Sequence, residues 1–166
     1  VKKNYKSLKY SYRFIFIPET IGSIAYLSRN LNKLRRNMIS GYVLSCVGDE
    51  RAFSHVESRS GKTLSDISIK AALIGKKNVK HYSFLERGSD ERQYCAPNIN
   101  LPVSGFCRSK YHVYPEYHTS ADNFDVVTKD GLNGSFEVIK SVIDGFETCL
   151  IPKHSFLGEP QMSKYN

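Results

Sequence analysis

Residues 11–30, SYRFIFIPETIGSIAYLSRN, join an apolar run to a helical pattern across Pro18. Residues 11–17 are rich in β-branched and aromatic side chains, which predicts a buried parallel strand. Residues 20–30 repeat apolar side chains at helical spacing, and Thr20 is suited to cap the N-terminus of that helix. The stretch therefore predicts a strand that passes directly into a helix, which is the repeating unit of an α/β fold.

The same alternation continues along the chain, where further apolar runs predict strands and amphipathic runs predict helices. The expected strands are residues 39–47, 81–85 and 101–107, with residues 52–56 as a short hairpin partner of the first, and the expected helices are residues 62–77 and 130–150. Residues 86–100 and 109–124 are polar, contain proline and are expected to form loops. This order predicts a mainly parallel sheet with helices on both faces, whose functional loops gather at the carboxyl ends of the strands.

Length and composition fit one globular domain. The chain has 166 residues, of which 40% are hydrophobic and 24% charged, which is enough for one core and too little for two ordinary domains. We expect the α/β domain to occupy residues 1–150 and residues 151–166 to form a tail or the start of a following domain. The longest apolar run is too short to span a bilayer, so no membrane partner is expected. Four cysteines without a C-x-x-C pair favour free thiols and a cytoplasmic location.

The formal net charge of +8 raises the question of nucleic-acid binding. The basic residues are dispersed, and their densest groups are the first nine residues, Lys33, Arg35 and Arg36 in an expected loop, and residues 76–80. None of these groups lies in a recognisable nucleic-acid motif. A solvated surface is the preferred interpretation, and no nucleic-acid partner is expected.

Two residues are candidates for catalysis or metal binding. Glu19 lies between the expected strand and helix, so its carboxylate is near a helix N-terminus at the edge where α/β sites form. It either caps the helix or acts in catalysis, and its position alone does not decide between them. His118 lies in the second expected loop, where it is either a surface residue or a metal ligand whose partner carboxylate is Asp122.

The first expected loop places Asp90, Glu91 and Arg92 side by side. They form either a surface ion pair or part of a pocket for a charged end of a substrate. We interpret His55 and His81 as packed or surface histidines in or beside strands. The sequence signatures of serine hydrolases, helix-borne metalloproteases and P-loop enzymes do not occur in the chain.

Residues 10–30, 88–123 and 158–161 resemble a bacterial aminopeptidase-like branch of the zinc exopeptidase superfamily, a branch associated with polysaccharide biosynthesis. The segments that carry the resemblance are YSYRFIFIPETIGSIAYLSRN, GSDERQYCAPNINLPVSGFCRSKYHVYPEYHTSADN and GEPQ, and the similarity covers nearly the whole chain. It implies a zinc exopeptidase-like fold, present here as a fragment that is incomplete at the N-terminus. The branch has upstream His-x-Cys-His-Pro and Ala-Asn-Asp-Asn segments that this sequence lacks.

The resemblance also implies roles for individual residues. Glu19 matches the general base that acts on a zinc-bound water, and His118 matches a histidine ligand of the zinc. Thr20 and Ser45 stand where typical members of the superfamily have metal-binding carboxylates, so one zinc ion with further ligands from upstream is expected. The candidates for binding the substrate, a peptide or an amino-acylated small molecule, are Asp90, Glu91, Arg92, Tyr94, Tyr114 and Tyr117.

The missing carboxylates keep a second hypothesis open. The chain is either part of a zinc-dependent aminopeptidase or a binding and scaffolding module that has the peptidase fold without turnover. The unpaired edge of an incomplete parallel sheet favours self-association, which leaves a homo-oligomer open. We expect the chain alone to bind zinc weakly and to hydrolyse nothing measurable.

Overall fold

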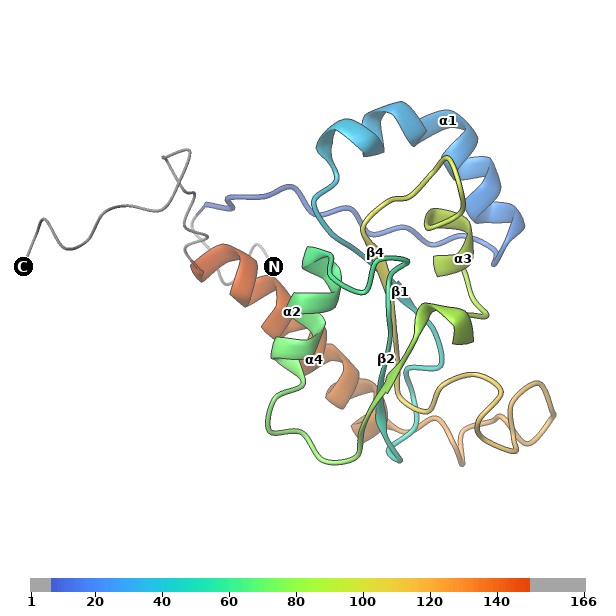
Figure 1. Ribbon diagram of the computed structural model, residues 1–166. Coiled ribbons are helices and arrows are strands. Elements are labelled where there is room, and N and C mark those ends of the chain that lie inside the picture. The colour runs from blue at the N-terminus through green and yellow to red at the C-terminus, as the bar shows by residue number, and fades with distance from the viewer. Residues whose placement is uncertain (1–6, 150–166) are drawn as a thin grey trace, which may run out of the picture.

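A four-stranded sheet lies between two layers of helices in the computed structural model, which describes residues 7–149 (Figure 1). The strands are β1 (Gly41–Leu44), β2 (Phe53–Val56), β3 (Val79–Tyr82) and β4 (Val103–Cys107), in the order β1-β4-β2-β3. β1 is parallel to β4 and β2 is parallel to β3, whereas β2 and β4 are antiparallel. The prediction of a mainly parallel sheet is confirmed, with one antiparallel junction at its centre.

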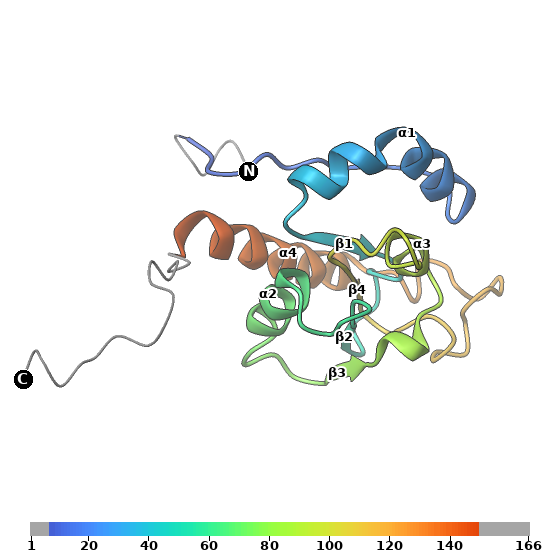
Figure 2. The same ribbon diagram turned by 45° about the horizontal axis from the view of Figure 1, so that its top comes forward.

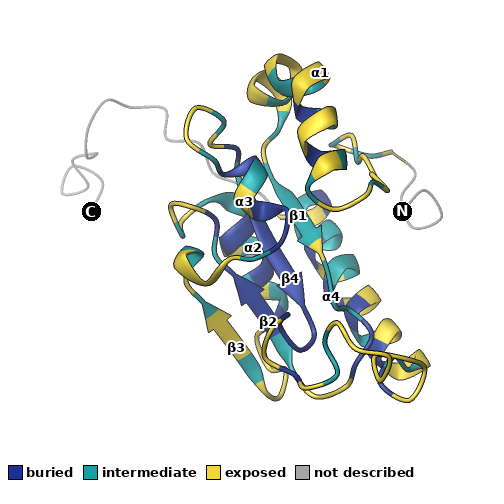
Figure 3. Ribbon diagram, turned by 90° about the vertical axis from the view of Figure 1, so that its right-hand side faces the viewer, coloured by how far each residue is buried: buried dark blue, intermediate teal, exposed yellow. Residues whose placement is uncertain are grey.

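Helices cover both faces of the sheet, as predicted (Figure 2). The helices are α1 (Ile21–Asn37), α2 (Leu64–Ala72), α3 (Glu91–Tyr94) and α4 (Lys129–Thr148), with a 3-10 helix, η1, at Phe84–Glu86. α1 and α3 pack on one face around Val103, and α2 and α4 pack on the other around Phe106. Every residue of β4 is buried (Figure 3), because its side chains alternate between the two helical layers.

The N-terminal turn of α4 is fastened to the loop that follows β1. A Cβ atom at Gly131 would collide with the backbone carbonyl of Gly48, so only glycine allows this close approach. The Thr128 N–H donates to the Gly48 carbonyl at 2.9 Å, and the Ser135 hydroxyl donates to the Val47 carbonyl at 2.7 Å. The helix on one face of the sheet thereby fixes the loop at the carboxyl end of β1.

Residues 11–17 do not form the predicted strand. They run beside α1 (Figures 1 and 2), where Arg13 donates to the Tyr26 hydroxyl at 2.7 Å. The side chains of Phe14 and Phe16 are 65% and 95% exposed. An apolar run becomes a strand only when a neighbouring strand takes up its backbone hydrogen bonds, and none of the pairings in the described part of the chain involves this run.

The predicted hairpin between the β1 region and residues 52–56 is also wrong. β4 lies between β1 and β2, and β2 pairs with β4 and β3 instead. β4 is the strand that is buried along its whole length, so it takes a central position with a neighbour on each side.

Several boundaries differ from the prediction. α1 continues to Asn37, so Lys33, Arg35 and Arg36 lie in a helix and not in a loop. Thr20 precedes α1 but makes no side-chain capping bond, since its φ of 61° departs from the extended conformation of a capping residue. The predicted loop 86–100 contains the one-turn helix α3.

The remaining predicted elements are confirmed in kind. The helices expected at 62–77 and 130–150 correspond to α2 and α4, and residues 109–124 contain neither helix nor strand. None of the helices in residues 7–149 is long and apolar enough to cross a bilayer. The predicted tail, residues 151–166, lies outside the described residues.

Candidate functional site

The turn before α1 is tied to the start of α3. The Thr20 N–H donates to Oδ1 of Asp90 at 2.7 Å, and the Arg92 guanidinium donates to the Thr20 hydroxyl at 2.8 Å. Asp90 is 8% exposed, whereas Glu19 and Arg92 are exposed. The structure therefore brings two of the predicted regions together and leaves one carboxylate and one guanidinium facing solvent.

Tyr117 connects this turn with the loop that carries His118. The Tyr117 ring stacks on the His118 imidazole, with 3.9 Å between the ring centroids. Burial raises the pKa of the Tyr117 hydroxyl, with smaller contributions from Cys46 and from the negative charge of Glu19, while Arg92 opposes the rise. His118 thus contacts Tyr117 directly, and Glu19 lies within electrostatic range of the same tyrosine, although the two residues are far apart in the sequence.

Aromatic side chains fill the rest of the His118 loop. The Tyr117 ring makes edge contacts with Tyr114 and His112, at centroid distances of 5.6 and 4.8 Å. The Tyr114 hydroxyl donates to Oδ2 of Asp122 at 3.0 Å. Burial, followed by hydrogen bonds with Cys46 and Asp122, raises the pKa of Tyr114. Asp122 therefore contacts Tyr114, and its predicted role beside His118 stays a prediction.

A carboxylate that accepts two hydrogen bonds and one ion pair hold the His118 loop against the loop that follows β1. The buried carboxylate of Asp49 accepts from the Ser109 N–H at 2.7 Å and from the Ser109 hydroxyl at 2.8 Å. Arg51 forms a two-point ion pair with Glu116, with N–O distances of 2.8 and 2.7 Å. The Arg51 guanidinium lowers the pKa of Glu116 to about 2. Sequence patterns do not pair Arg51 with Glu116, because no local spacing relates them.

Two of the predicted substrate-binding residues lie in the interior. Oε1 of Glu91 accepts from the Tyr111 hydroxyl at 2.5 Å and from the Gly88 N–H at 2.9 Å, and the residue is fully buried. Tyr94 packs under α1, where the Ser23 hydroxyl donates to its oxygen at 3.5 Å. These positions support the loops from below, and a role of either residue in binding substrate stays a prediction.

Backbone strain gathers around Tyr117. Cys46, His112 and His118 have φ values of 49°, 64° and 59°, which non-glycine residues seldom adopt, and the His112 ring contacts Tyr117. Tyr117 packs in the same cluster as Cys46 and stacks on His118. Such residues persist only where their surroundings fix them, and they are frequent at functional sites.

The described residues do not complete a zinc site. Within residues 7–149, no group of three His, Cys, Asp or Glu side chains is placed to hold a metal ion. His118 offers one exposed imidazole and Glu19 one exposed carboxylate, whereas a catalytic zinc site has three protein ligands and an open position. A hollow of about 420 Å³ lies beside α1, lined by Leu27, Gln93 and Ile99 among others, and neither Glu19 nor His118 lines it.

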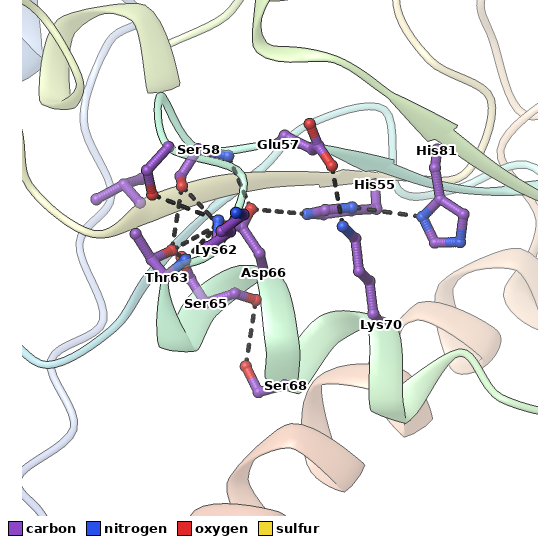
Figure 4. Close-up of polar contacts among 12 residues, drawn as sticks. His55, Glu57, Ser58, Lys62, Thr63, Ser65, Asp66, Ser68, Lys70 and His81 are labelled. Carbon is purple, nitrogen blue, oxygen red and sulfur yellow. Dashed lines mark hydrogen bonds and ion pairs between the residues drawn. The ribbon is translucent and has the colours of Figure 1, made fainter.

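A second polar cluster lies between β2 and α2 (Figure 4). Asp66 accepts five hydrogen bonds: from Nε2 of His55 at 3.1 Å, from the Ser58 N–H and hydroxyl at 2.8 and 2.5 Å, and from the Thr63 N–H and hydroxyl at 2.9 and 2.7 Å. Burial alone would raise the pKa of Asp66, but these bonds together hold it far below its usual range. The sequence interpretation missed Asp66, although the Thr63-x-x-Asp66 spacing is that of a capping box.

The two histidines near this cluster behave as predicted. His55 is fully buried on β2, and His81 is exposed on β3, where it occupies the neighbouring register position. Their Nδ1 atoms are 3.4 Å apart. Burial, and then the neighbouring His55, lowers the pKa of His81.

A curated protein of Clostridium acetobutylicum, described as a candidate polysaccharide biosynthesis protein with an aminopeptidase-like domain, is 42% identical to this chain over 162 residues. The match covers 94% of this chain and 36% of that protein. The chain thus spans little more than a third of the length of this curated relative.

Two solved structures are similar to this one. A candidate peptidase of Clostridium acetobutylicum matches with a TM-score of 0.81 and 40% identity, over 99% of this chain and 39% of the other. A zinc aminopeptidase of Bacillus subtilis matches with a TM-score of 0.60 and 19% identity, over 74% of this chain and 32% of the other. The second likeness shows the fold alone, which is that of part of a bacterial aminopeptidase.

The predicted resemblance to aminopeptidases is therefore confirmed at the level of the fold and of the described relatives. A family pattern described as "Domain of unknown function (DUF4910)" matches residues 1–148. Since this match includes all the elements described above, the chain belongs to the DUF4910 family.

Proposed function

We propose that this chain is part of the catalytic domain of a zinc-dependent aminopeptidase, in which Glu19 is the general base and His118 is one zinc ligand. The observation that carries the proposal is Tyr117, which stacks on His118 and lies within electrostatic reach of Glu19. The aminopeptidase-like domain of the 42% identical relative supports it independently. The other zinc ligands would come from parts of the longer protein outside residues 7–149.

Glu19 is suited to move a proton. Its side chain is exposed just before the N-terminus of α1, at the turn that Asp90 ties to α3. A carboxylate in this position takes a proton from the attacking water and passes it to the leaving amine. Zinc, when bound, lowers the pKa of its water and polarises the scissile carbonyl.

The surrounding side chains suggest how a peptide would be held. Arg92 and the Tyr114 and Tyr117 rings lie around the same turn and loop, so they can orient a peptide by hydrogen bonding and ring contact. Asp90 and Glu91, at the start of α3, remain candidate partners of the free amino terminus of the substrate. We place the protein in a reducing cytoplasm, since its four cysteines are free thiols.

A binding module without turnover is the second candidate. Thr20 and Ser45 carry hydroxyls where the zinc exopeptidase superfamily is expected to have metal-binding carboxylates, and the Thr20 hydroxyl already accepts from Arg92. A peptidase fold that lacks these ligands would bind peptides and not cleave them.

The test uses the protein as its gene encodes it, with zinc measured by mass spectrometry and hydrolysis measured on a panel of aminoacyl p-nitroanilides. We expect Glu19→Gln to keep zinc and to lose activity by roughly 10²–10⁴-fold, the usual share of general acid–base catalysis. His118→Ala should lose the zinc ion of the proposed catalytic centre. Glu137→Gln, which changes an exposed carboxylate on α4, is the matched control. Activity that survives Glu19→Gln would disprove the assignment, and peptide binding without hydrolysis by the wild type would favour the binding module.

A further inference from the structure

We infer that His55 and His81 form a binding site for one divalent transition-metal ion of the Zn²⁺ type at the edge of the sheet, separate from the Glu19 and His118 loops. The two imidazoles come from adjacent positions on parallel strands β2 and β3. Their Nδ1 atoms face one another at 3.4 Å (Figure 4).

Asp66 leaves His55 with a nitrogen that can bind a metal. Both oxygens of Asp66 accept hydrogen bonds from backbone N–H groups, those of Ser58 and Thr63. The Asp66 carboxylate therefore also accepts, and does not donate, in its hydrogen bond with His55. Nε2 of His55 must therefore carry the hydrogen that it donates to Oδ1 of Asp66 at 3.1 Å. The lone pair of His55 is left on Nδ1, directed at His81. A carboxylate behind the imidazole is the usual arrangement for metal-binding histidines.

The spacing of the two nitrogens fits a tetrahedral ion better than an ordinary hydrogen bond. Hydrogen bonds from N–H donors are usually about 2.7–3.2 Å long, so 3.4 Å is a weak contact. Two nitrogens that each lie about 2.0–2.1 Å from a tetrahedral zinc are roughly 3.3–3.4 Å from each other. An ion bound to both nitrogens would lie to one side of the line that joins them, so the two imidazole rings would turn toward it while the backbone pairing of β2 and β3 stays the same.

The affinity of the site for an ion depends on how the ion reaches it and on the charges and ligands around it. His81 is exposed on an edge strand, so an ion and its waters can enter from that side, while His55 is closed off behind it. In residues 7–149, no third His, Cys, Asp or Glu completes the site, so water fills the remaining positions. The neighbouring ion pair of Lys70 and Glu57, 2.9 Å apart, adds one charge of each sign. Two imidazoles without a third ligand predict a modest affinity.

The test is calorimetric titration of the 166-residue chain with Zn²⁺ in a non-chelating buffer, because the described part of this chain does not complete the proposed catalytic centre around His118. We expect one ion per chain, at least about tenfold weaker binding by His81→Gln, and unchanged binding by His118→Ala. His81→Gln is the informative variant, because its amide still donates to His55 but is not a zinc ligand. His81 is exposed, so the variant is expected to fold, which circular dichroism checks.

A second measurement counts the ligands directly. Electron paramagnetic resonance of the chain with one equivalent of Cu²⁺ should show hyperfine coupling to two imidazole nitrogens, and to one in His81→Gln. Equal zinc affinity of the wild type and His81→Gln would overturn the inference, and so would absence of zinc binding by the wild type. Loss of binding in His118→Ala would also overturn it. Peptide hydrolysis enters none of these outcomes, so the inference stands or falls independently of the proposed function.

Discussion

The Asp66 cluster and the Glu19–His118 loops are built from the same chemical groups and differ in how far the fold satisfies them. Asp66 and His55 are fully buried, and Asp66 accepts five hydrogen bonds. Glu19 and His118 are exposed, and His118 has a left-handed backbone. A saturated polar cluster stabilises the fold, whereas groups with open coordination positions and strained backbones are available to a ligand.

Asp66→Ala should produce the largest loss of stability, because it removes the carboxylate whose hydrogen bonds are all satisfied. The variant leaves the buried His55 and Ser58 and the half-buried Thr63 without their acceptor. We expect a loss of about 3–5 kcal/mol in the free energy of unfolding. Urea denaturation followed by circular dichroism measures it, with the exposed Asp125→Ala as control. A loss below about 1 kcal/mol would mean that the cluster contributes little to stability.

The same carboxylate gives stability a pH dependence of known sign. The folded-state pKa of Asp66 lies below its ordinary value of 3.8, so its contribution is present above that value and is lost as pH falls further. The free energy of unfolding of the wild type should therefore fall more than that of Asp66→Ala when the pH is lowered from 5 into the acid range. Urea denaturation of both proteins at the same pH values measures the difference.

Arg51→Gln should have an intermediate effect, which we expect to be confined to the ion pair at the exposed His118 loop. It removes the cation that lowers the pKa of Glu116 to about 2, so that pKa should return toward its ordinary 4.5. Carboxyl-detected NMR titration measures the change, and Arg51→Lys should restore part of the shift. A Glu116 pKa that does not move in Arg51→Gln would show that the ion pair does not form in solution.

His118→Asn should have the smallest effect on stability. Asparagine tolerates the left-handed conformation at this exposed position, so we expect a change within about 0.5 kcal/mol. In the protein as its gene encodes it, the same substitution should abolish zinc binding at the proposed catalytic centre. Substantial unfolding of His118→Asn would show that the residue serves the fold and not a ligand.

Apolar periodicity predicted most of the fold because buried strands and helices can be recognised from the spacing of their own apolar residues. The apolar run of β4 is buried along its whole length, and Val138 and Val142 of α4 are buried, although Phe136 of α4 is exposed. The failure at residues 11–17 has the opposite cause, since a strand also needs a partner and the sequence of the run does not contain one. α3 is a single turn, too short to show a helical period.

The candidate site was predictable only in part. Resemblance predicted Glu19 and His118; in the structure His118 stacks on Tyr117, and Glu19 lies within electrostatic range of that tyrosine. The sequence did not predict the Arg51–Glu116 ion pair or the contact between His55 and His81. These contacts depend on loop packing and strand register, which local sequence patterns do not encode.

The contact between Gly131 and the Gly48 carbonyl couples the N-terminal turn of α4 to the loops beside it. A methyl group at Gly131 would push the helix away from the backbone at Gly48, and the adjacent Asp49 anchors Ser109 at the root of the His118 loop. A substitution in a helix that touches no ligand can thus displace the loop that would bind one. Natural variants at position 131 would then alter recognition by displacing the loop that follows β1, with every side chain of the site unchanged.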